Sequence, residues 1–80
     1  MTTKTTRPIY EIADDIRRDW KTPYFGAVPY LEAMESLNAV TDHYFEDSAR
    51  SVIAYFLANA GTWRGDTARL VKAELKALIK

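Results

Sequence analysis

The chain has 80 residues, of which 48% are hydrophobic and 12% aromatic, and 11 basic residues balance 11 acidic ones. So much apolar surface without net charge predicts one folded domain and excludes intrinsic disorder, which requires low hydrophobicity and high net charge. The chain contains no cysteine, which excludes a disulfide framework, a thiolate zinc site and a cysteine nucleophile.

Residues 1–7 are polar and show no apolar periodicity, so a flexible N-terminal arm is predicted there, followed by a single domain over 8–80. No apolar run approaches the roughly 20 residues that span a bilayer, and the first residues lack the apolar core of a signal peptide. A cytoplasmic protein without membrane contact is therefore expected.

Apolar residues at helical spacing predict an all-α domain, a small bundle of three to four short helices. The first helix is expected over 8–20, because Pro8 suits a first helical turn and isoleucines follow at intervals of three and four. The second is expected over 29–37, since Pro29 disfavours helix in the residue before it and Asn38 can end the helix.

The ten residues after Asn38 are too mixed for a regular element, and we expect a loop, with at most one helical turn, in which Tyr44 and Phe45 cover the core. A third helix is predicted over 48–60 from its strong apolar repeat, capped by Asp47 or Ser48.

The stretch AGTWRGD (60–66) predicts the corner of a helical hairpin. Gly61 is expected to end the third helix in the left-handed conformation, and Thr62 to cap a fourth helix over 63–79. A start after Asp66 is the alternative, because a glycine inside a helix costs about 1 kcal/mol relative to alanine. With the early start, close packing explains Gly65.

Trp63 and Arg64 have two interpretations. The structural one places the Trp63 indole in the core. The functional one exposes both side chains as a binding hot spot, since tryptophan and arginine are enriched there. The loop aromatics Tyr24, Phe25 and Tyr44 join this second interpretation.

No reaction motif is present, and no catalytic residue, metal ligand set, cofactor or small-molecule ligand is predicted. His43 is the only histidine, and Glu46 and Asp47 beside it are weak support for a metal site, which usually needs three protein ligands. We expect an exposed or capping histidine. The acidic residues of the first helix alternate with basic ones and predict a solvated, salt-bridged face.

Charge is distributed unevenly along the chain. Residues 22–49 contain five acidic residues and no lysine or arginine, and with their aromatics they could form an anionic surface for a basic partner. Four cations recur at intervals of three and four along the last helix: Arg69, Lys72, Lys76 and Lys80. Such a stripe is either a solvated face or a surface for a phosphate backbone, although the chain as a whole is neutral and Glu74 is close in sequence.

PYFGAVPYLEAM (23–34) and SVIAYFLANAGTWRGDTARLVKAELKALIK (51–80) resemble a family of small uncharacterised open reading frames of actinobacterial phages, plasmids and related mobile elements. The resemblance covers most of the chain and implies an accessory protein of a mobile element, with no assigned chemistry.

Together these features predict a non-enzymatic helical binding or adaptor protein that contacts a protein partner, or forms a homodimer, through Trp63, Arg64 and the loop aromatics. The alternative is a nucleic-acid-binding regulator that uses the basic stripe of the last helix.

Overall fold

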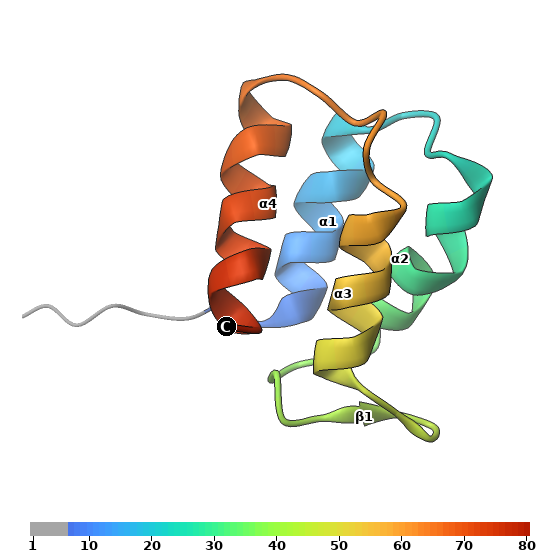
Figure 1. Ribbon diagram of the computed structural model, residues 1–80, viewed down its shortest axis with the longest axis vertical. Helices are drawn as coiled ribbons and strands as arrows, with labels where there is room; N and C mark the ends of the chain where they lie inside the picture. The colour runs from blue at the N-terminus through green and yellow to red at the C-terminus, as the bar shows by residue number, and fades with distance from the viewer. Residues whose placement is uncertain (1–6) are drawn as a thin grey trace, which may run out of the picture.

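The computed structural model describes residues 7–80, so all of the arm predicted for residues 1–7 except Arg7 lies outside the described residues. Within this range the chain forms four α-helices, α1 (Ile9–Asp19), α2 (Val28–Met34), α3 (Ala49–Ala58) and α4 (Asp66–Leu78). Each helix packs against the next, and α4 packs against α1, so the helices form a ring around one core (Figure 1). None of the helices within 7–80 combines the length and apolar character that crossing a bilayer requires.

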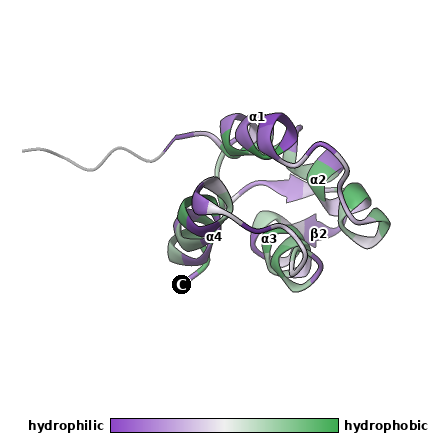
Figure 2. Cartoon of the chain, turned by 90° about the horizontal axis from the view of Figure 1, so that it is seen from above, coloured by the Kyte–Doolittle hydropathy of each residue, from purple (hydrophilic) through white to green (hydrophobic). Residues whose placement is uncertain are grey.

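The helical periodicity of the sequence correctly predicts most of the core. The fully or nearly fully buried side chains of the helices include Ile9, Ile12, Ala13, Ile16, Leu31, Met34, Val52, Ile53, Phe56, Val71 and Leu75. Hydrophilic residues cover the outer side of α1, as the view from above shows (Figure 2). Leu70 is an exception to the predicted stripe of the last helix, because it is 71% exposed. At about 100° per residue it lies on the opposite side of α4 from Leu75.

The start of α1 is hydrogen-bonded to the residues that follow α2, Leu37 and Asn38. Pro8 is the N-cap residue and provides no side-chain cap, so the first free N–H groups of the helix need other acceptors. The Ile9 N–H donates to the Asn38 carbonyl at 2.9 Å, and the Tyr10 N–H donates to the Leu37 carbonyl at 3.0 Å. These two bonds join α1 to a segment about 30 residues later in the chain.

The second helix begins and ends earlier than the predicted 29–37. A short 3₁₀ helix, η1 (Phe25–Ala27), leads directly into α2, which ends at Met34. Beyond it, the Ser36 N–H donates to the Ala33 carbonyl at 3.1 Å, so the chain continues in tighter turns. Asn38 therefore does not end the helix.

A β-hairpin replaces the loop that was predicted before the third helix, so the domain is mostly helical but not all-α. Strand β1 (His43–Tyr44) pairs antiparallel with β2 (Asp47–Ser48), with His43 opposite Ser48. The two residues between the strands make the reversal, and Phe45 adopts a φ of 58° there. A strand of two residues is too short to show an alternating apolar pattern, so the sequence did not predict these strands.

The start of α3 agrees with its prediction. Ser48 is the N-cap residue, and its hydroxyl accepts a hydrogen bond from the Ser51 N–H at 3.1 Å. The helix ends at Ala58, two residues before the predicted end. Gly61 does not end it in the left-handed conformation, since Gly65 is the glycine with a positive φ in the described part of the chain.

The early start predicted for the last helix is wrong: α4 begins at Asp66, and Gly65 is its N-cap. The packing explanation for Gly65 is wrong as well, because a Cβ added there would meet no atom within 4 Å. Gly65 is explained by its backbone, whose φ of 114° and ψ of 180° lie in a region that essentially only glycine occupies. Thr62 therefore does not cap this helix.

Arg7, which was predicted to belong to the flexible arm, is part of the folded domain. Its guanidinium makes two hydrogen bonds of 2.9 Å to the Glu74 carboxylate and an ion pair of 2.6 Å with Asp15. The pKa of Arg7 is raised, chiefly by the hydrogen bond from its side chain to Glu74. Arg7 thereby links α1 to α4.

Candidate protein-binding surface

Trp63 lies in the core, as the structural interpretation of its stretch proposed. Its side chain is 2% exposed and stacks on Trp20, with ring centroids 5.7 Å apart and an angle of 9° between the planes. Phe56 meets both indoles edge-on. The Trp63 Nε1–H donates to Asp19 at 2.8 Å, which satisfies the one polar group of the ring. A hot spot of exposed Trp63 with Arg64 is therefore excluded, although Arg64 itself is exposed.

Two pairs of aromatic side chains lie near η1 and between α2 and α3, and we call Tyr24, Phe25, Tyr30 and Tyr55 the aromatic patch, of which Tyr30 is half-buried against the core. Phe25 is 79% exposed, Tyr55 54% and Tyr24 45%. The rings of Tyr24 and Phe25 are 4.8 Å apart, and those of Tyr30 and Tyr55 are 5.5 Å apart and stacked. The predicted binding residues Tyr24 and Phe25 thus lie together at the surface.

The two halves of the aromatic patch meet at Gly26 and Asn59. A Cβ at Gly26 would lie 2.6 Å from the Tyr24 ring and 2.9 Å from the Asn59 Oδ1, so a side chain there would displace the Tyr24 ring or the Asn59 amide. Asn59 donates through its side-chain amide to the Tyr55 carbonyl at 2.9 Å, one turn earlier on α3. The patch is therefore held in place by the fold rather than carried on a free loop.

Tyr55 was not predicted as a binding residue. It lies outside the buried stripe of α3, which comprises Ala49, Val52, Ile53 and Phe56. A large aromatic on the outer side of an amphipathic helix was the available signal. Its stacking on Tyr30 could not be predicted, because it depends on how α2 packs against α3.

Tyr44 and Phe45, which were both expected to cover the core, differ in burial within the hairpin. Tyr44 is half-buried and packs against the core, which leaves less of this predicted binding residue available to a partner. Phe45 is 86% exposed at the tip of the hairpin, so its predicted covering role is wrong. The reason is its position in the reversal, where the positive φ directs the chain back toward β2.

Two of the five acidic residues of 22–49, Glu35 and Asp42, are engaged in local hydrogen bonds. Glu35 accepts a hydrogen bond of 2.7 Å from Arg17 of α1, and this bond raises the pKa of Arg17, with a smaller contribution from Glu32. Asp42 accepts from the Asn38 and Ala39 N–H groups at 3.0 Å each. These bonds lower the pKa of Asp42, that from Ala39 most strongly. Each of these carboxylates therefore contributes to the local structure.

The predicted basic stripe is altered at both ends. Arg69, Lys72 and Lys76 lie on α4, whereas Lys80 follows the end of that helix. Arg64 approaches Lys72 from the preceding loop, and both line one open hollow with Arg69. The pKa of Lys72 is lowered, first by burial and then by the positive charges of Lys76 and Arg64.

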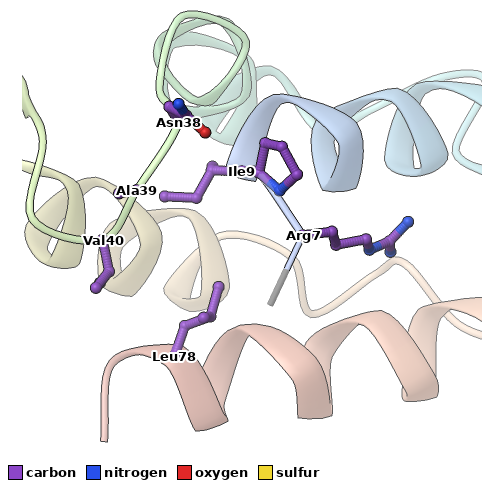
Figure 3. A pocket seen from close by; sticks show the side chains of 7 residues that line it. Arg7, Ile9, Asn38, Ala39, Val40 and Leu78 are labelled. Atoms are coloured by element: carbon purple, nitrogen blue, oxygen red, sulfur yellow. The ribbon is translucent and has the colours of Figure 1, made fainter. Parts of the chain in front are cut away.

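An apolar crevice of about 240 Å³ lies between the start of α1, the segment after α2 and the end of α4. Its lining comprises Arg7, Pro8, Ile9, Asn38, Ala39, Val40 and Leu78 (Figure 3). The Arg7 side chain points away from it, toward its carboxylate partners. The crevice therefore offers apolar contact but no acid or base.

His43 is exposed in β1, opposite Ser48. Across residues 7–80, histidine, aspartate and glutamate side chains form no group of three or more that could hold a metal ion.

Comparison of the chain with protein-family models, curated proteins and solved structures finds no match.

Proposed function

We propose that this protein is a non-enzymatic helical binding module whose aromatic patch contacts a protein partner or a second copy of the chain. The observation that carries the proposal is the exposure of Phe25, Tyr24 and Tyr55, with the Phe25 ring packed on that of Tyr24. Tyrosine and phenylalanine are enriched at protein interfaces, and burying such rings removes a large apolar area from water.

The construction of the aromatic patch supports this function. Its rings are already in contact within each pair, Tyr24 with Phe25 and Tyr30 with Tyr55, so binding would immobilise few additional side chains and lose little conformational entropy. A chain of 80 residues with a small core has reason to bury its aromatics, and leaving Phe25 79% exposed serves no packing purpose. The partner surface should be apolar, with acceptors for the tyrosine hydroxyls.

We further propose that the module is an accessory protein of a mobile element and acts in the cytoplasm. The first part rests on the resemblance of 23–34 and 51–80 to open reading frames of phages and plasmids. The second rests on the lack of cysteine, which suits a reducing compartment.

A photo-crosslinking amino acid at position 25 tests the aromatic patch directly. The chain would be expressed in its native cell with p-benzoylphenylalanine in place of Phe25, and illuminated adducts would be identified by mass spectrometry. We expect one dominant adduct, with a partner protein or with a second copy. The matched control places the same group at Leu70, which is 71% exposed on α4.

Equal adduct patterns at positions 25 and 70, or no adduct at position 25, would contradict the proposal. Sedimentation velocity of the purified chain over a range of concentrations separates the two kinds of partner. Concentration-dependent association that is lost in Phe25→Ser identifies a second copy, whereas a monomer with an adduct in the cell identifies another protein.

A further inference from the structure

The cations of the last helix gather with a loop arginine on one side of the molecule. At about 100° per residue, Arg69, Lys72 and Lys76 lie within about 60° of one another around the axis of α4. Arg64 joins them from the loop, and an open hollow of about 330 Å³ is lined by Arg64, Arg69 and Lys72 together with the backbone around Gly65. We call Arg64, Arg69, Lys72 and Lys76 the basic face.

The acidic residues of this region compensate little of that charge. Glu74, close to the stripe in sequence, lies about 160° around the helix from Lys76 and is engaged by Arg7 beside α1. Asp66 pairs with Arg69 at 3.2 Å, but both side chains are largely exposed, and such pairs are weak in water. The charges of Lys76 and Arg64 instead disfavour the protonated form of Lys72.

Lys72 is fixed in position at the centre of this face. Its ammonium donates to the Trp63 carbonyl at 2.6 Å and lies 5.9 Å from the centroid of the Trp63 ring. An ammonium has three donors, so two remain for an anion after this bond. A positive group held by the core in this way does not need to be ordered when a ligand binds.

We propose that the basic face binds the phosphate backbone of double-stranded DNA. From Arg69 to Lys76 the helix rises about 10 Å, which matches about three phosphates at 3.4 Å of axial spacing per strand. The nearest large aromatic, Trp63, is buried, so this face lacks the exposed ring on which single-stranded bases would stack. A duplex is therefore favoured over a single strand.

The distribution of charge over the fold makes this binding compatible with a neutral chain. Glu32 belongs to α2, Glu35 directly follows its end, and Glu46 and Asp47 belong to the hairpin. α2 lies away from α4, on the other side of α1 and α3, and the hairpin lies below α3 (Figure 1). A duplex along α4 would thus meet the four cations of the basic face and the exposed Asp66 that pairs with Arg69, whereas these four acidic residues lie elsewhere. This site is separate from the aromatic patch and does not depend on its function.

Fluorescence anisotropy with a labelled duplex of about 20 base pairs, between about 50 and 200 mM salt, tests the proposal. Three to four phosphate contacts predict that the logarithm of the association constant falls with that of the salt concentration, with a slope of about −3. The test variant is Arg64→Gln with Lys76→Gln, since neither side chain is part of the core. The matched control is Lys21→Gln with Arg50→Gln, which removes the same charge from exposed positions elsewhere.

We expect the test variant to lose at least about tenfold in affinity at low salt and to reduce the slope by about 2, whereas the control changes affinity less than about threefold. Circular dichroism verifies that both variants fold. Absence of duplex binding by the unchanged chain at low salt, equal losses in both variants, or tighter binding of a single strand of the same length would each overturn the proposal. Phe25→Ser should bind the duplex normally, so this result is independent of the aromatic patch.

Discussion

Trp63 connects three parts of the fold through three different groups. Its ring stacks on Trp20 after α1, its indole N–H donates to Asp19, and its carbonyl accepts from Lys72 on α4. A single residue in the loop therefore ties the corner between α3 and α4 to α1. This explains how a corner with two glycines remains ordered.

Replacing Trp63 by alanine should lower the free energy of unfolding by about 3–5 kcal/mol, because it leaves a cavity in the core beside Trp20 and Phe56. This is a large share of the stability of a chain of this size. Urea denaturation followed by far-ultraviolet circular dichroism measures the loss. Leu70→Ala is the control and should change the value by less than about 0.5 kcal/mol. A Trp63→Ala protein as stable as the parent would show that the indole is not part of the core.

Phe45 combines two unfavourable features, an exposed ring and a left-handed backbone. For residues with a side chain that conformation costs about 1–2 kcal/mol, and glycine adopts it freely. Phe45→Gly should therefore raise the free energy of unfolding by about 0.5–1 kcal/mol, after allowance for the greater entropy of the unfolded glycine. Thermal denaturation gives the sign, and Phe25→Gly, whose φ is not positive, should not be stabilising.

The interiors of the helices were predictable, but several of their ends were not. Apolar spacing reports which face of a helix is buried, and that signal is repeated over many residues. An end is decided by a few local bonds, such as the Ser48 cap, which the sequence indicated, or the φ of Gly65, which it did not. A glycine that relieves packing and one that supplies a positive φ are identical in sequence.

The two glycines of the corner should respond oppositely to alanine. Gly65→Ala forces a side chain into a backbone region that favours glycine and should destabilise the protein by about 1–3 kcal/mol. Gly61 has neither a positive φ nor an atom within 4 Å of an added Cβ, so Gly61→Ala should be neutral or stabilising by up to about 1 kcal/mol. Melting temperatures of the two variants measured in parallel decide this, and equal shifts would contradict it.

In the molecule as a whole, the aromatic patch and the basic face lie on different elements. The aromatic patch extends over η1, α2 and α3, and the basic face follows α4 on the other side. The sequence already indicated the cations and Tyr24 with Phe25, because each set is local in the chain. It could not indicate Tyr55 beside Tyr30, Arg64 beside Lys72 or Glu74 bound to Arg7, since these contacts depend on how the helices pack.

The stacked tryptophans have a practical consequence for spectroscopy. Trp20 and Trp63 are the only two tryptophans of the chain, and both belong to one buried pair. Fluorescence excited selectively in tryptophan therefore originates in the interior, out of reach of water-soluble quenchers while the helices remain packed. Because the aromatic patch contains tyrosine and phenylalanine but no tryptophan, a partner that occupies it leaves this emission shielded, and a sudden rise in quenching reports the opening of the core itself.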